Sequence, residues 1–268
     1  MRWWRGARGH TLVEFVIAMA LGLIVTAGAI SLYTTQRSAF ERASNATRMR
    51  EAGLTALMLI GPQLQMAGFV PAGVVGYNAP SPLFGCSGGR PTGAADSPGC
   101  TTLSTGSDGV AIRYVGDGVS TWPSSSGQIT DCVGQGVKSS DAALGSEGVP
   151  VVNRYFANVS ESTGEPELYC DGNGNAGSAQ PLVEGVERVR LRYWLAGAPV
   201  AIDASAVPAD QWTNIVAVDL CVIVRGAPQG QRSRYVDCDG VSTLGTDLRP
   251  RQAFSRRVAL RNRTESSS

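Results

Sequence analysis

The sequence predicts an α+β protein, in which one long N-terminal helix packs on a C-terminal antiparallel β-sheet. Three observations lead to this fold class. Residues 15–36 carry no charged side chain, and the apolar residues that follow keep helical spacing up to about residue 60. In the last third of the chain, apolar and polar residues alternate as they do in half-buried strands. The 33 glycines and 14 prolines favour loops and short strands over a helical bundle.

Composition excludes several classes of protein. With 268 residues, 43% hydrophobic and 17% charged, the chain suits one ordinary domain plus an additional element, and it is not a disordered protein. A net charge of +1 does not indicate a broad basic surface that would bind nucleic acid. Every basic side chain except Lys138 and His10 is an arginine. His10 is the only histidine, so a histidine base or histidine metal ligand in a folded domain is excluded.

The uncharged run at residues 15–36 is long enough to cross a membrane as a helix, which takes about 20 residues. It is too long for the apolar region of a cleaved signal peptide, about 7–15 residues, and no small-residue cleavage site follows it. Arg2, Arg5 and Arg8 precede the run. By the positive-inside rule they hold the N-terminus in the cytoplasm, so the chain beyond about Gln36 lies across the membrane.

Glu14 stands directly before the uncharged run, where an ionised carboxylate in lipid costs a few kcal/mol unless it has a partner. One interpretation is a glutamate at the interface whose side chain reaches the headgroups. The other depends on Gly9. Cleavage after Gly9 would create an amino terminus at His10, four positions before Glu14 on one helical face, and the two charges could neutralise each other within or between chains.

The stretch GHTLVE at residues 9–14, followed by an apolar helix, resembles the start of type IV prepilins. This resemblance implies that residues 1–9 are a leader removed by prepilin peptidase, that His10 becomes the N-methylated N-terminus, and that Glu14 guides the subunit into register during assembly. The sequence departs from the family at one position, because phenylalanine usually follows the glycine and His10 stands here.

The helical pattern continues past the apolar run, and residues 10–60 as one helix would be about 75 Å long. Gly61-Pro62 predicts an end or a kink. Ala18 and Gly22 form a small-xxx-small pair that lets another helix approach closely. For the second half, an ordinary amphipathic core helix remains the alternative. The apolar positions of this second half are Phe40, Ala43, Ala46, Leu54, Leu57, Met58 and Ile60.

Residues 68–180 are rich in Gly, Ser, Pro and Thr, which predicts a long irregular connection with a few strands, such as 110–115 and 149–156. The stretches 87–89 and 124–127 are expected to form flexible tips. The antiparallel sheet is expected in the last third of the chain. Its predicted strands are Val186–Leu195, Ile215–Arg225 and a third that contains Phe254, Val258 and Leu260.

Three further stretches resemble the PilW group of minor pilins: MAGF at 66–69, LVEGVE at 182–187 and VALRNR at 258–263. The middle hundred residues carry no such resemblance. The resemblance implies a type IV pilin-like fold. The predicted organisation is a leader at 1–9, a transmembrane helix at 10–36, its amphipathic continuation at 37–66, and a disulfide-containing β-rich head at 67–268.

Six cysteines in an exported head predict disulfides: Cys86, Cys100, Cys132, Cys170, Cys221 and Cys238. Fifteen pairings are possible, and we favour pairing between sequence neighbours. A zinc site is the alternative, but the sequence has no CxxC spacing and no histidine beyond His10.

Nothing in the sequence predicts catalysis, a metal or a cofactor. Residues 171–175 (DGNGN) imitate the start of a calcium loop, but Ala176 and Leu182 stand where an EF-hand needs glycine and an acid, so a polar turn is expected. No Ser-His-Asp or Cys-His set can be assembled. We interpret the paired carboxylates as turn or surface residues. These pairs are Glu165 with Glu167 and Asp237 with Asp239.

The sequence thus predicts a PilW-type minor pilin that takes part in priming and assembly of the type IV pilus, at or near its tip. Expected partners are prepilin peptidase, the inner membrane and the assembly platform, the major pilin, other minor pilins and a tip adhesin. DNA is not an expected partner. Two alternatives stay open: a minor pseudopilin of type II secretion, and a periplasmic binding domain on an uncleaved signal anchor.

Overall fold

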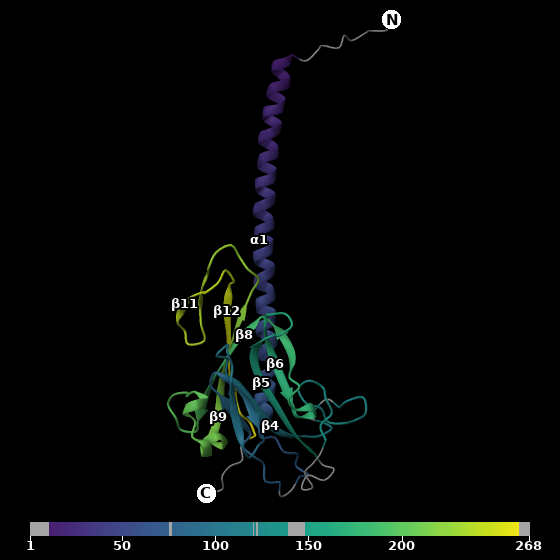
Figure 1. Ribbon diagram of the computed structural model, residues 1–268, viewed down its shortest axis with the longest axis vertical. Coiled ribbons are helices and arrows are strands. Elements are labelled where there is room, and N and C mark those ends of the chain that lie inside the picture. Colours follow the sequence, from purple (N-terminus) through teal and green to yellow (C-terminus); the bar gives the residue numbers. More distant parts are fainter. Residues whose placement is uncertain (1–10, 75–76, 120, 122, 139–147, 263–268) are drawn as a thin grey trace. The chain divides into compact units, whose positions relative to one another are not determined.

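The computed structural model describes residues 11–74, 77–119, 121, 123–138 and 148–262 (Figure 1). The chain forms two compact units, Met1–Thr47 and Arg48–Ser268, which we call the stem and the head. Each unit is described separately below.

One helix, α1 (Leu12–Met66), supplies the stem and continues into the head. The sequence predicted an end or a kink at Gly61-Pro62, but the helix does not end there and runs on to Met66 with Pro62 inside it. Proline removes one backbone donor from the helix. Packing outweighs that loss, because Ile60 and Leu64 on either side of the proline are fully buried. The chain leaves the helix at Gly68, whose φ of 76° suits glycine.

A five-stranded antiparallel sheet occupies the region where a long irregular connection was expected, so that expectation was wrong. The proposed strands at 110–115 and 149–156 are present, but they are parts of longer strands. Every residue of the interior strand β4 is buried, which removes the alternation that marks a half-exposed strand. The order in the sheet is β1 (Leu83–Cys86), β4 (Gly109–Gly116), β5 (Val149–Val159), β6 (Pro166–Gly172) and β7 (Gln180–Glu184).

The head also contains smaller elements. Two hairpins and three short 3₁₀ turns lie between the main strands. The proposed tip at 87–89 is the tight turn that joins β1 to the first hairpin, with Gly88 at φ 62°. The hairpins are β2 (Gly89–Gly93) with β3 (Pro98–Thr102), and β10 (Arg234–Val236) with β11 (Ser242–Leu244); the turns are η1 (Asn173–Asn175), η2 (Ala204–Ala206) and η3 (Ala209–Asn214).

A second, three-stranded antiparallel sheet has the order β12 (Arg251–Ala259), β9 (Ile215–Arg225) and β8 (Val186–Leu195), as the alternation in the last third predicts (Figure 1). Leu260, expected within the third strand, lies just beyond β12, although its N–H still bonds to the Val216 carbonyl at 2.9 Å. Gly185, with φ 81°, joins β7 of the first sheet directly to β8 of the second.

The core of the head lies between the last turns of α1 and the two sheets. The helix contributes Met49, Ala56, Leu57, Ile60 and Leu64. One polar contact is buried with them: the Asn153 amide donates to Gln63 Oε1 at 2.9 Å, and so links β5 to the helix. The second half of α1 is therefore a core helix of the head, and one of its faces directs these apolar side chains at the sheets.

Candidate functional site

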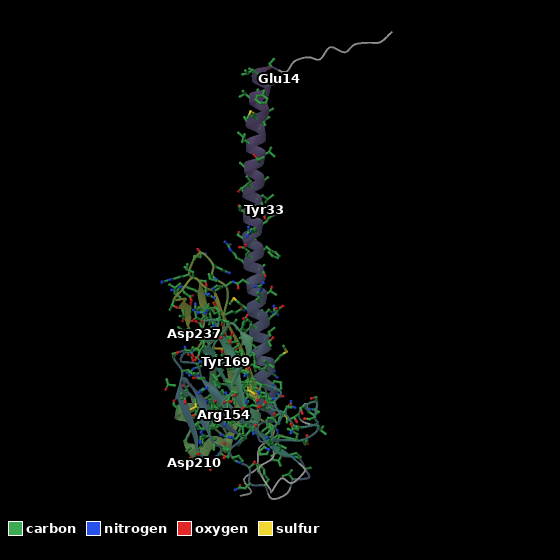
Figure 2. All side chains as sticks on the ribbon, turned by 45° about the vertical axis from the view of Figure 1, so that its right-hand side comes forward. Glu14, Tyr33, Arg154, Tyr169, Asp210 and Asp237 are labelled. Carbon is green, nitrogen blue, oxygen red and sulfur yellow. A yellow bond between two sulfur atoms is a disulfide. The ribbon has the colours of Figure 1, made fainter. Side chains whose placement is uncertain are left out.

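The start of α1 is a capping box formed by Thr11 and Glu14. The Thr11 N–H donates to Glu14 Oε2 at 2.8 Å, and the Glu14 N–H donates to Thr11 Oγ1 at 3.4 Å. Together these bonds pair two backbone donors that a helix start otherwise leaves without partners. Sequence analysis missed this role of Glu14, although the spacing T-x-x-E directly before an apolar run is its signature. Figure 2 shows Glu14 at this end of the helix.

Gly9 and His10, the proposed cleavage and methylation site, lie outside the residues that the structure describes. The structure therefore places only the third member of the proposed set, Glu14, at the helix start.

The stem exposes its apolar side chains and pairs its hydroxyls internally. Thr26 Oγ1 donates to the Gly22 carbonyl at 2.9 Å, and the Thr35 hydroxyl donates to the Ser31 carbonyl, also at 2.9 Å. Such bonds let polar side chains enter an apolar medium without unpaired donors. The helix is long and apolar enough to cross a membrane. The exposed large apolar residues of the stem are Leu12, Val13, Phe15, Val16, Ile17, Met19, Leu21, Leu23, Ile24, Val25, Ile30, Leu32, Tyr33 and Phe40.

Ala18 and Gly22 lie on this exposed surface, where a Cβ built on Gly22 meets nothing within 4 Å. The same holds for Gly28. Ala18 and Gly22, four residues apart, share one face of the stem, which suits the close approach of a second helix there.

The six cysteines form three disulfides between sequence neighbours, which is the pairing favoured from the sequence. These are Cys86–Cys100, Cys132–Cys170 and Cys221–Cys238. The first ties the β2–β3 hairpin to β1, and the last ties the turn between β10 and β11 to β9. The disulfides therefore secure the loop-rich parts of the head.

The calcium-like stretch is a turn whose oxygens already accept backbone hydrogen bonds. Asn173 Oδ1 accepts from the Val152 N–H at 3.0 Å, and Asp171 Oδ1 accepts from the Gly177 N–H at 2.8 Å. Throughout the described ranges, no three His, Cys, Asp or Glu side chains are grouped as metal ligands.

Of the two carboxylate pairs, three members are turn or surface residues and one is not. Glu165 is 40% exposed and bonds to Arg249 and Arg225; burial raises its pKa, but the bonds from these two guanidinium groups outweigh this and lower the pKa. Asp237 organises the turn between β10 and β11. Glu167 was wrongly interpreted, since it is only 5% exposed on β6 and accepts a bond from the Tyr169 hydroxyl at 2.8 Å.

An uncovered apolar helix with a single carboxylate at its start, continuing into the core of a β-rich head, defines a pilin-like protein. Comparisons with known proteins identify its family. Residues 154–262 match the family model of type IV pilus-assembly protein W, and residues 4–30 match the prokaryotic N-terminal methylation motif. The chain therefore carries a PilW domain and a prepilin methylation motif, the marks of PilW-type pilins of the type IV pilus, a family of structural subunits and not an enzyme class.

Among solved structures, a type IV-like pilin from Thermus thermophilus is similar, with 11% identity, a TM-score of 0.39, and coverage of 81% of this chain and 95% of the other. No curated protein sequence matches the chain significantly. The PilW match covers the second half of β5 and every later strand, and the methylation motif covers Glu14 and much of the stem.

Proposed function

We propose that this protein is a minor pilin that takes part in priming and assembly of the type IV pilus, at or near the tip. Prepilin peptidase cleaves it after Gly9, and the new N-terminus at His10 is methylated. The match to the methylation motif over residues 4–30 supports both steps. The protein spans the inner membrane once with its N-terminus in the cytoplasm, and its head reaches the periplasm and then the cell surface.

The observation that carries this proposal is the combination of Glu14 with an exposed apolar stem. Within 12–36, Glu14 is the only charged residue, and the surrounding large apolar side chains are more than half exposed. Because lipid is as apolar as these side chains, packing the stem against other stems is driven by close van der Waals contact and by polar partners. A buried carboxylate must find a positive partner, so it favours one register in which an amino terminus lies beside it.

Mass spectrometry of the N-terminus of the purified full chain tests the processing. We expect a chain that begins with a methylated His10. A strain without prepilin peptidase should yield a chain that starts at Met1. If Met1 is retained where the peptidase is active, the protein is an uncleaved signal-anchored domain and the proposal is wrong.

Variants at the helix start separate the charge of Glu14 from its capping role. Glu14→Gln keeps an oxygen that can accept the Thr11 N–H but removes the charge, whereas Thr11→Ala removes only the hydroxyl half of the capping box. We expect Glu14→Gln to insert in the membrane but to lose most piliation. Thr11→Ala should assemble nearly normally.

The measurement is the amount of sheared surface pili, with membrane-fraction immunoblots as the control for insertion. Normal piliation with Glu14→Gln would contradict the assembly role of the charge. Loss of an exported substrate instead of pili would identify a type II secretion pseudopilin. Of these two systems, the PilW match favours a role in the pilus over a role in type II secretion.

A further inference from the structure

The two edges of the three-stranded sheet differ in how they are covered. Residues before β4 cover the β8 edge: the Val189 N–H donates to Ser107 Oγ at 2.9 Å, and the Leu191 N–H donates to Asp108 Oδ2 at 3.0 Å. Further along β8, the Tyr193 N–H bonds to the Ile202 carbonyl at 2.8 Å. This edge therefore has no free donors for a partner at these three positions.

The β12 edge presents a free row of backbone groups. The Leu260 N–H donates to the Val216 carbonyl, and the Gly226 N–H donates to the Pro250 carbonyl. Hydrogen-bonded pairs alternate along antiparallel strands, so the even-numbered residues of β12 are the ones that bond to β9. The N–H and C=O groups of residues 253, 255, 257 and 259 therefore point outward. Within the described part of the chain, no hydrogen bond to these outward groups is present. The register is continuous over all nine residues, so β12 is a regular template for another strand.

An exposed apolar flank of α1 lies next to this edge. Gly61 lies against Arg256 and Val258 of β12. Leu54 and Met58 precede Gly61 by seven and three residues, so they share its side of the helix. Gln63 on another side of the helix bonds to β5 instead. Leu54 is 42% exposed and Met58 63% exposed, although both belong to the head.

The charges on β12 indicate what the edge can accept. Arg257 pairs with Asp219, with Nη2 to Oδ2 at 3.0 Å. Arg256 is exposed, and among the described residues no acid forms an ion pair with it. A second copy of β12 would bring arginine against arginine, which disfavours self-pairing. A strand with a carboxylate would instead neutralise Arg256.

We propose that the free edge of β12, together with the flank of Leu54 and Met58, binds an extended segment of another protein that adds a strand to the sheet. Its apolar side chains cover Leu54 and Met58, and a carboxylate on the same face lies beside Arg256. Backbone hydrogen bonds to the outward groups supply affinity, and the alternating side chains supply specificity. This docking site lies wholly in the head and does not depend on the assembly role of Glu14.

The first test uses the full chain in detergent micelles and a capped peptide, Thr-Val-Thr-Glu-Thr-Val-Thr, whose one face carries Val, Glu and Val. Hydrogen exchange at the amides of 253, 255, 257 and 259 should slow when the peptide is saturating, whereas the even-numbered amides are protected with or without it. A matched peptide with lysine in place of the glutamate should bind about tenfold more weakly, as expected for reversing one exposed ion pair.

Two variants make the test specific. Ser255→Pro removes an N–H that the sheet does not use and blocks the edge, so peptide binding should be lost while the β9 amides stay protected. Ser255→Ala is its control and should bind normally. Arg256→Glu should reverse the preference between the two peptides, so that the lysine peptide binds more tightly than the glutamate peptide.

The proposal is overturned if the saturating peptide protects none of the four amides, if Ser255→Pro binds as well as Ser255→Ala, or if Arg256→Glu leaves the peptide preference unchanged. Each of these results leaves the proposal that the protein is a pilus subunit untouched, because none of them concerns the stem.

Discussion

Asp108 joins the two sheets of the head through a single buried carboxylate. Its Oδ1 accepts from the Gly88 N–H at 2.8 Å, its Oδ2 accepts from the Leu191 N–H at 3.0 Å, and Arg190 Nη1 lies 3.4 Å from Oδ2. The residue is only 3% exposed. Without this carboxylate, buried donors would be left unpaired, which costs about 1–3 kcal/mol for each group.

A second carboxylate, Asp247, makes head stability depend on pH. The bond from Arg251 lowers the pKa of Asp247 from 3.8 to about 2. Because the folded pKa lies below the unfolded one, Asp247 stabilises the fold fully above about pH 4, and this contribution is lost as the pH falls towards 2. Its side chain is 38% exposed, so we expect an effect of less than about 1 kcal/mol.

Urea unfolding at pH 6 and pH 2.5 measures this effect. Asp247→Asn should reduce the difference in the free energy of unfolding between the two pH values. The control is Asp210→Asn, an exposed residue of η3 whose carboxylate, among the described residues, accepts a side-chain bond only from the neighbouring Gln211. If the free energy of unfolding changes equally between pH 6 and pH 2.5 in Asp247→Asn and in the parent protein, the role of this ion pair is contradicted.

At the scale of elements, the contact between α1 and β12 depends on a glycine. Gly53 is buried in the middle of the helix, and a Cβ built on it would overlap the ring of Phe254. Alanine is the better helix former by about 1 kcal/mol, but the clash should cost about 1–3 kcal/mol. We therefore expect Gly53→Ala to lower the free energy of unfolding of the head by about 1 kcal/mol.

Thermal unfolding of the head measures the effect of Gly53→Ala. Gly28→Ala is the matched helical control, because its Cβ would meet nothing within 4 Å and it lies outside the head. It should leave the Tm of the head unchanged. Adding Phe254→Leu to Gly53→Ala should recover part of the loss, and a double variant as unstable as the sum of the two single ones would contradict the proposed contact.

Elements differed in how well the sequence predicted them. β8 and β9 lie at their predicted bounds, because each alternates between arginines or small residues and buried apolar residues. β4 and β5 were only partly recognised. Their sheet is buried at its centre, so apolar side chains occupy both faces of β4 and a polar one, Asn153, is paired inside the core. Gly61-Pro62, where an end or a kink was predicted, lies inside α1 because burial around Pro62 outweighs local propensity.

For the whole molecule, the structure predicts where the chain can be shortened. Residues 48–66 of α1 belong to the head and supply five of its buried apolar side chains, beginning with Met49. A chain that begins at Arg37 should be soluble without detergent and should unfold cooperatively. A chain that begins at Ala67 should fail to fold, because it loses these side chains at about 2–5 kcal/mol for each large one.

Circular dichroism and thermal unfolding of both shortened chains check this prediction. The Cys132–Cys170 disulfide, which closes 38 residues, should be oxidised only in the chain that folds. A stable chain starting at Ala67 would contradict the assignment of the second half of α1 to the core.

The sequence by itself determined the long helix, the apolar stem with Glu14, the family, and the strands of the C-terminal sheet. These features depend on local composition, spacing and periodicity, which can be read along the chain. Only the tertiary structure decided the five-stranded sheet, the burial of Glu167 and Asp108, and the free edge of β12. Each of these depends on which distant segments pack together, and burial or pairing between such segments leaves no regular pattern along the chain.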